Sequence, residues 1–279
     1  MNQTSKVSII IPVYKPDLSV FKKVKAMIKK QTIESEIIEM WNNPEAVSMN
    51  KGIKKANGRI VVTLAQDCVP HDKYWLEKLV KPLENKNVIG SVSDLYVPKE
   101  YWKNYPFLTK ILTINERTIR RPTMDARACA FRKKDIIMIG MFNENPKTIA
   151  IDGDLKERLE KKGEIIHPNV IVDHLHPLDN SRKLKLDFRY AEANGKLLKA
   201  KMVKKEIWKR LLRATPLFGM LPIIYVFPWR KFRECWFWFF PYLFSMPLQN
   251  IIYFIGFWKG FLLDKESMRN KEVLNEKKD

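Results

Sequence analysis

The stretch SMNKGIKKANGRIVVTLAQDCVP, residues 48–70, places one acid where a folded chain could bind a ligand. Ser48 and Asn50 indicate the start of a short helix, which a following Asn-Gly pair ends. The apolar run 60–64 then predicts a buried strand that leads to Asp67. Because open α/β sheets bind ligands beyond the carboxyl ends of their strands, Asp67 is predicted to contact a ligand. A capping or turn role is the alternative, since aspartate is common in turns.

A second pair of acids, Asp152 and Asp154, stands at the start of a helix predicted over residues 151–162. Carboxylates are favoured at that end of a helix by its dipole, which could explain either acid without any function. A carboxylate in this position could also remove a proton from a hydroxyl group as its oxygen attacks another atom.

The elements that must position these acids alternate between strands and helices. Continuous β-branched runs predict buried strands, and apolar residues at helical spacing predict the helices between them. The alternation over about the first 95 residues predicts an α/β fold with a doubly wound, mostly parallel sheet. The expected strands are 7–13, 36–40, 60–64, 88–92, 126–131, 164–166 and 170–172, and the expected helices are 18–30, 72–83, 133–140 and 151–162.

The last third of the chain differs in composition. Residues 182–213 carry twelve Lys or Arg against three Asp or Glu, and Val203, Ile207 and Leu211 predict a basic amphipathic helix. Residues 235–258 carry no charge and are rich in aromatic side chains.

The uncharged segment is long enough to span a bilayer, which takes about 20 apolar residues. Prolines and amides interrupt it, and its aromatic residues are spread along it rather than gathered at two ends. We therefore expect an interfacial or re-entrant segment beside the basic helix on an anionic membrane surface. The alternative is a buried hairpin that covers the predicted α/β domain.

Three motifs in order resemble the family 2 glycosyltransferases of the GT-A type: the opening VSIIIPVY, the 48–70 stretch, and IDGDLKERL from residue 151. The segment L-x-Q-D-x-x-P around Asp67 is similar to a variant in rhamnosyltransferase-like members, and the resemblance covers about residues 6–180. It implies an inverting glycosyltransferase. The donor would be a nucleoside-diphosphate sugar (UDP, dTDP or GDP), and the acceptor a hydroxyl of a lipid-linked or cell-surface glycan.

The resemblance implies a divalent cation, Mn²⁺ or Mg²⁺, at Asp67, although Ala65 stands where the family has a first Asp. Relatives complete the metal shell with a histidine at the position of the 174–176 pair. Residues two apart in a strand point to opposite faces, so one histidine is expected to bind the metal. We expect His174, because His176 precedes a proline; a histidine-rich turn without a metal role is the alternative.

The resemblance also implies a nucleotide pocket. Its residues would lie in the first strand, in the loop after the second strand and in the 48–70 stretch, namely Pro12, Tyr14, Trp41, Asn42, Asn43, Asn50, Gln66 and Asp67. The loop is shortened to Trp41, Asn42 and Asn43, which could stack on a base or hydrogen-bond it, or simply form a turn.

The acceptor side is implied by the segment from residue 151 and by the residues before it. Asp152 aligns with the family's catalytic base, although Ile151 replaces the leading Glu of the motif. Asp125, Arg127, Asp154 and Arg158 are expected to contact the acceptor or the diphosphate.

The net charge of +20 implies an anionic partner, and three scattered cysteines suggest neither a disulfide framework nor a zinc cluster. We expect a catalytic domain over 1–180, a basic and aromatic extension over 181–263, a charged tail over 264–279, and a place on the cytoplasmic face of the cell membrane. A nucleotidyltransferase is an alternative, but the sequence has no glycine-rich phosphate loop near the first strand, which such an enzyme would need. A basic module binding membrane or nucleic acid is another, but it leaves the ordered motifs unexplained, and no nucleic-acid partner is expected.

Overall fold

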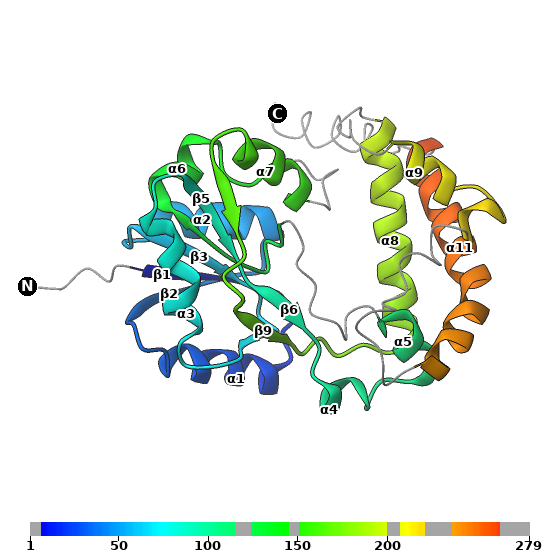
Figure 1. Ribbon diagram of the computed structural model, residues 1–279, viewed down its shortest axis with the longest axis horizontal. Helices are drawn as coiled ribbons and strands as arrows, with labels where there is room; N and C mark the ends of the chain where they lie inside the picture. The colour runs from blue at the N-terminus through cyan, green and yellow to red at the C-terminus, as the bar shows by residue number, and fades with distance from the viewer. Residues whose placement is uncertain (1–6, 115–123, 145–150, 200–206, 221–235, 263–279) are drawn as a thin grey trace, which may run out of the picture. The chain divides into compact units, whose positions relative to one another are not determined.

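The computed structural model describes residues 7–114, 124–144, 151–199, 207–220 and 236–262 (Figure 1). These residues form two compact units. Residues 7–105, 124–144 and 151–177 make up the first unit, and the other described residues make up the second. The second unit therefore takes residues 106–114 from within the stretch predicted as one catalytic domain.

The first unit is built on a six-stranded sheet of order β2-β1-β3-β7-β5-β8. Its strands pair in parallel except at β7, which is antiparallel to both neighbours. The strand bounds are β1 Val7–Val13, β2 Ser35–Trp41, β3 Ile60–Leu64, β5 Val88–Val92, β7 Ala128–Arg132 and β8 Glu164–Ile166. The predicted mostly parallel α/β sheet is confirmed.

Helices cover both faces of this sheet, as expected of a doubly wound fold. Apolar residues of α1 (Leu18–Lys29) and α3 (Trp75–Val80) pack on one face. Those of α2 (Glu45–Lys55), α6 (Lys133–Met138) and α7 (Ile151–Glu160) pack on the other. A short 3-10 helix, Lys81–Glu84, follows α3, and α4 spans Lys99–Trp102.

A smaller sheet of order β4-β9-β6 lies at the carboxyl end of β3. It consists of β4 Cys68–Pro70, β9 Ile171–His174 and β6 Asp94–Tyr96. The antiparallel pairing of β4 with β9 sets Cys68 opposite His174, residues that are far apart in the sequence. Because Cys68 directly follows Asp67 in the sequence, this register brings His174 close to Asp67.

The predicted helix start at Ser48 is wrong, because α2 begins at Glu45 and already includes Ser48 and Asn50 as buried residues. Pro44 stands just before the helix, where its missing N–H costs no hydrogen bond. The packing of α2 on β1 is close. A Cβ atom on Gly52 would lie 2.3 Å from the side chain of Ile10.

The second unit is helical. Its helices are α5 Phe107–Leu112, α8 Asn180–Lys199, α9 Ile207–Arg213 and α11 Phe239–Leu262, with 3-10 turns at Phe218–Met220 and Trp236–Trp238. Of the predicted basic amphipathic helix, Val203 lies outside the described residues, and α9 buries none of its side chains. The apolar side chains of α9 therefore do not face a core, although they have helical spacing.

Helices α8 and α11 lie side by side at a very short distance (Figure 1). A Cβ atom on Gly195 of α8 would lie 2.0 Å from the carbonyl oxygen of Phe257, and one on Gly260 of α11 would lie 2.0 Å from that of Glu192. Only glycine leaves the two backbones room for this approach. No described helix is both long and apolar enough to cross a membrane.

Candidate active site

Asp67 lies beside both histidines of the 174–176 pair, and the three residues form a group that could hold a metal ion. The Asp67 Oδ2 atom lies 2.7 Å from His176 Nδ1 and 3.5 Å from His174 Nε2. The two imidazole rings stack with their centroids 5.7 Å apart. One ligand atom from each residue lies within 4.8 Å of the others. A carboxylate oxygen and two imidazole nitrogens are ligands that suit a divalent transition-metal ion such as Mn²⁺.

The expectation that only one histidine faces Asp67 is wrong. It assumed that both residues continue one strand, in which alternate side chains point to opposite faces. Strand β9 ends at His174, and His176 lies beyond it. The following backbone is held by two tyrosines, whose hydroxyls donate hydrogen bonds to the carbonyl oxygens of Leu175 and His176. The chain can therefore turn the second ring back onto Asp67.

Asp67 is held in its charged form. Burial alone would raise its pKa, but His174 and His176 hold the pKa of this carboxyl well below its usual range. The backbone carbonyl of Asp67 also accepts a hydrogen bond of 2.8 Å from the Leu175 N–H. An ionised, fixed carboxylate is what a divalent cation requires of a ligand.

Asp152, the predicted base, lies in the first turn of α7, and its Oδ1 accepts a hydrogen bond of 2.9 Å from the Ala126 N–H. Burial, followed by the negative charge of Asp125, raises its pKa to about 7. A carboxyl with a pKa near neutrality is well matched to general-base catalysis. The geometry therefore provides a suitable proton acceptor at the position that the motif predicts.

Asp125 and Arg127 form a pair beside this carboxyl. The guanidinium donates two hydrogen bonds to the Asp125 carboxylate, of 2.9 and 2.6 Å. Burial raises the pKa of Asp125, but Arg127 outweighs this effect and keeps the pKa below its usual value. Arg127 remains partly exposed while Asp125 is buried, so the aspartate fixes a cation that a diphosphate could reach.

Glu45 is the residue of this group that the sequence analysis missed. Burial, followed by the nearby carboxylates of Asp125 and Asp67, raises its pKa, while Arg127 opposes the rise. Neighbouring protein atoms desolvate this carboxyl, while the residue as a whole stays exposed to solvent. The available signal was an acid directly after Pro44, a common arrangement at the first turn of a helix.

Asp154 and Arg158, which were predicted to contact the acceptor or the diphosphate, bond to each other and to the scaffold. They form an ion pair of 2.6 Å within α7. The guanidinium also donates hydrogen bonds to the carbonyl oxygens of Ile139 and Met141 in the turn after α6. These bonds connect α7 to the turn after α6.

Asn50 and Gln66 are likewise bound to the backbone, although both were predicted to contact the nucleotide. The buried amide of Asn50 donates to the carbonyl oxygen of Phe142 and accepts from the Phe142 N–H, at 2.8 and 3.0 Å. The amide of Gln66 makes the same pair of bonds to the backbone of Tyr14, at 3.0 and 2.9 Å. Gln66 thus connects the ends of β1 and β3, and Asn50 connects α2 to the segment after α6.

The remaining predicted nucleotide residues lie at the ends of β1 and β2 and in the turns that follow them. Tyr14 is 60% exposed and Trp41 is 45% exposed, which leaves both rings accessible to a base. Asn42 adopts a positive φ of 57°, so it forms a turn. The Asn43 amide donates to the Trp41 carbonyl at 2.7 Å and accepts from Lys51. Pro12 is partly buried in β1.

Comparison with known proteins agrees with this architecture. Residues 34–142 match the family model for Glycosyl transferase family 2. The mannosyltransferase PcManGT from Pyrobaculum calidifontis, solved in complex with GDP-Man and Mn²⁺, superposes with a TM-score of 0.57 at 12% identity, over 95% of this chain and 89% of that one. A mutant of Drosophila β1,4-galactosyltransferase 7, solved with manganese, UDP-Gal and xylobiose, gives a TM-score of 0.41 at 14% identity, over 62% and 71%. No curated protein matches in sequence. The likeness to the Pyrobaculum structure shows that the α/β fold is of the GT-A type.

Proposed function

We propose that this chain, a glycosyltransferase whose residues 34–142 belong to Glycosyl transferase family 2, transfers its sugar with inversion from a nucleoside diphosphate to a hydroxyl acceptor. One observation carries the proposal. The carboxyl of Asp152 has a pKa of about 7 and interacts electrostatically with Asp125, Arg127 and Glu45. Glu45 also interacts with the negative charge of Asp67. A base for the acceptor and a cation site for the leaving group thus occur together.

The proposed reaction is a single displacement at the anomeric carbon. Asp152 accepts the proton of the acceptor hydroxyl as that oxygen bonds to the anomeric carbon, and the bond from this carbon to the diphosphate breaks on the opposite side. Asp67, His174 and His176 would hold the divalent cation, which neutralises charge on a leaving diphosphate when it is bound. Arg127, fixed by Asp125, adds a second positive charge for the diphosphate.

For the donor, we propose that the base lies against the turns after β1 and β2, where Tyr14 and Trp41 expose their rings. A UDP-, dTDP- or GDP-sugar fits this proposal, with a deoxyhexose such as rhamnose among the sugars to be tested. The Pyrobaculum mannosyltransferase binds GDP-Man with Mn²⁺, which supports Mn²⁺ as the first cation to try.

Equilibrium binding of UDP, dTDP and GDP in the presence of Mn²⁺ tests this assignment. One nucleotide is expected to bind more tightly than the others, and the Trp41→Ala variant is expected to weaken it by roughly tenfold, the scale of one lost stacking contact. Tyr74→Ala, an exposed aromatic residue on the loop before α3, is the matched control. Equal and Trp41-independent binding of all three nucleotides would contradict the assignment.

The pH dependence of turnover follows from Asp152. Only the ionised carboxylate accepts a proton, so kcat/KM is expected to rise with pH up to about 7, the raised pKa of this group, and to level off above it. A bound cation lowers that pKa, which moves the rise to a lower pH. A pH profile measured from about pH 5 to 9 checks the expectation, and a flat profile contradicts it.

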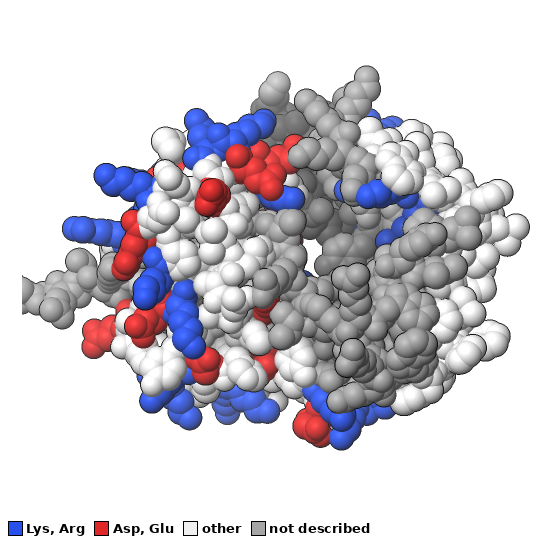
Figure 2. Space-filling view, viewed as in Figure 1, with Lys and Arg blue, Asp and Glu red and all other residues white. Residues whose placement is uncertain are grey.

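We further propose a lipid-linked or cell-surface glycan acceptor, reached from the cytoplasmic face of the membrane through a peripheral contact of α11. One side of α11 packs on α8, while the other exposes a row of large apolar side chains: Phe240, Leu243, Phe244, Leu248, Ile251, Ile255 and Leu262. Figure 2 shows few charged atoms over this helix. Such an apolar face beside basic helices is typical of interfacial binding to anionic lipid.

Replacing Phe244 by glutamate is expected to weaken binding to anionic vesicles by roughly tenfold or more, because a large apolar side chain contributes about 1.5–3 kcal/mol when buried. Phe244 is 82% exposed, so the fold should tolerate the change. Vesicle flotation measures the effect, with Tyr74→Glu in the first unit as the control. Equal flotation of wild type and Phe244→Glu, or none by either, would contradict the proposed contact.

A further inference from the structure

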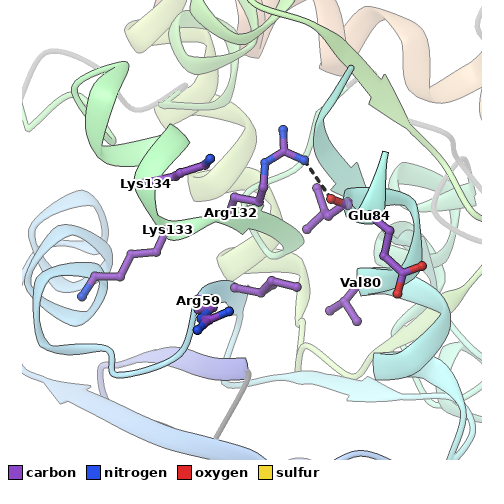
Figure 3. A pocket seen from close by; sticks show the side chains of 8 residues that line it. Arg59, Val80, Glu84, Arg132, Lys133 and Lys134 are labelled. Atoms are coloured by element: carbon purple, nitrogen blue, oxygen red, sulfur yellow. Dashed lines mark hydrogen bonds between the residues drawn. The ribbon is translucent and has the colours of Figure 1, made fainter. Parts of the chain in front are cut away.

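A cavity lies at the amino-terminal edge of the main sheet, where β3 begins. It has a volume of about 520 Å³ and is lined by Arg59, Ile60, Val80, Leu83, Glu84, Arg132, Lys133 and Lys134 (Figure 3). This volume falls within the range of small-molecule sites, roughly 300–1,000 Å³. The proposed function uses none of these residues.

The register of the sheet separates this cavity from the candidate active site. Ile60 begins β3 and pairs with Arg132 at the end of β7. Asp67 follows the opposite end of β3, a five-residue strand. The strand alone is roughly 16 Å long at about 3.3 Å per residue, so the cavity lies at the edge opposite the metal-binding group.

The floor of the cavity is apolar. Ile60, Val80 and Leu83 come from β3, α3 and the 3-10 helix, and each belongs to the hydrophobic core, with an exposed fraction of 8% or less. The cavity therefore opens onto core side chains rather than onto a polar surface. An apolar group that entered it would leave water for contact with these three residues.

The rim is cationic, and its four basic residues divide into two kinds. Arg132 is fixed by hydrogen bonds to the carbonyl oxygens of Leu83, Asn85 and Lys86. Lys133 donates to the Ala56 carbonyl at 2.6 Å, which turns its ammonium away from the floor (Figure 3). These two residues are structural.

Arg59 and Lys134 are different. Both are exposed, and within the described residues neither side chain has a hydrogen-bond or ion-pair partner. In Figure 3 both stand at the cavity on the side opposite Glu84, its single acid. An anionic group at the mouth would therefore meet two available cations, and charge-assisted hydrogen bonds to them are the strong kind.

We infer that this cavity binds a small amphiphile with one short apolar chain and one anionic headgroup, a phosphate monoester or a carboxylate. The chain would lie on Ile60, Val80 and Leu83, and the headgroup would meet Arg59 and Lys134. A phosphate monoester carries more charge than a carboxylate, so it binds more tightly to the same two cations.

Methyl NMR of the full chain provides a readout at the cavity itself, which is needed because the apolar face of α11 would also take up amphiphiles. Octyl phosphate is expected to shift the methyl signals of Ile60, Val80 and Leu83 in a saturable way. Ile53, buried on the opposite face of the sheet, should not respond. Removing each methylene from the probe should weaken binding by up to about fourfold, the value for a fully buried CH₂.

Variants separate the two parts of the site. Charge reversal at Arg59 or Lys134, written Arg59→Glu and Lys134→Glu, is expected to weaken octyl phosphate by about tenfold, as for the loss of one charge-assisted hydrogen bond. Lys29→Glu on the exposed side of α1 is the matched control and should leave binding unchanged. Octanoate should bind less tightly than octyl phosphate, while octanol and inorganic phosphate should bind much less tightly than either.

Three results would overturn the inference. The first is the absence of any shift at the three floor methyls with octyl phosphate. The second is an affinity for octanol or for inorganic phosphate that equals the affinity for octyl phosphate, because one half of the ligand would then contribute nothing to binding. The third is unchanged affinity in the double variant Arg59→Glu, Lys134→Glu.

Discussion

Asp152→Asn is expected to lower kcat by roughly 100-fold or more while donor affinity and folding are retained, because it removes the group that accepts the acceptor's proton. The substitution is nearly isosteric, and the amide oxygen can still accept the hydrogen bond from the Ala126 N–H. A structural role would therefore be preserved while proton transfer is lost. Single-turnover kinetics with saturating donor, together with donor binding by calorimetry, separate these effects.

Asp154→Asn is the matched control, since Asp154 lies two residues further along the same helix turn. Its carboxylate pairs with Arg158 rather than with any group of the site. This variant is expected to keep most of its kcat and to lose some thermal stability. Near-normal turnover in Asp152→Asn would contradict the assignment of Asp152 as the base. Another carboxylate would then accept the proton, and Glu45, whose charge acts on Asp152, would be the first to test.

Removing a ligand of the metal group is expected to have an effect of similar size. Asp67→Ala should lower activity by more than about 100-fold, because a cation that neutralises a leaving diphosphate contributes several kcal/mol. His174→Ala and His176→Ala should each weaken Mn²⁺ binding, since both rings face the same Asp67 oxygen. Electron paramagnetic resonance of Mn²⁺ measures that binding without any turnover.

His71→Ala is the control for these variants. His71 pairs with Asp173 at 3.1 Å on the same small sheet, yet it is not part of the metal-binding group. The His71→Ala variant should bind Mn²⁺ as the wild type does. If His176→Ala also binds Mn²⁺ normally, the coordination involves Asp67 and His174 alone, and the proposal that His176 is a ligand is wrong.

Much of the fold could be predicted from the sequence, because its signals are local. The runs at 7–13, 60–64 and 88–92 are mostly apolar, which is the pattern of strands buried on both faces, and the structure has β1, β3 and β5 at those bounds. The start of α2 was misplaced because Ser48 and Asn50 are common N-terminal residues, and burial against the rest of the fold overrode that local preference.

The site was predictable where a single motif carries it and unpredictable where distant segments meet. Asp67 and Asp152 were found from their own neighbours in sequence. The second histidine ligand depends on where β9 ends, and Glu45 depends on where α2 begins; neither boundary follows from local pattern.

Three polar residues predicted as ligand contacts also make backbone hydrogen bonds that the sequence did not predict. Asn50, Gln66 and Arg158 each bind backbone groups in a distant turn. Buried backbone groups must find partners, and sequence alone does not reveal which ones lack a partner in their own element. The bonds that these residues make to the scaffold therefore could not be predicted from the matching motifs.

The extension shows the same limit at the level of packing. Its composition indicated basic and aromatic helices, and α8 and α11 are present. The glycines that bring the two helices together stand on different helices, Gly195 on one and Gly256 and Gly260 on the other. The role of these glycines is evident only when the helices are paired, because glycine inside an isolated helix lowers the stability of that helix.

The most direct test of the central claim, divalent-cation-dependent sugar transfer at Asp67 and Asp152, is release of nucleoside diphosphate from sugar donors by the purified full-length chain. UDP-, dTDP- and GDP-sugars, GDP-mannose and dTDP-rhamnose among them, are incubated with Mn²⁺, with EDTA, and with EDTA followed by excess Mn²⁺. We predict release from one class of donor that stops in EDTA, returns with Mn²⁺, and is lost in Asp67→Ala. Release that continues undiminished in EDTA, or no release from any donor with Mn²⁺, would contradict the account.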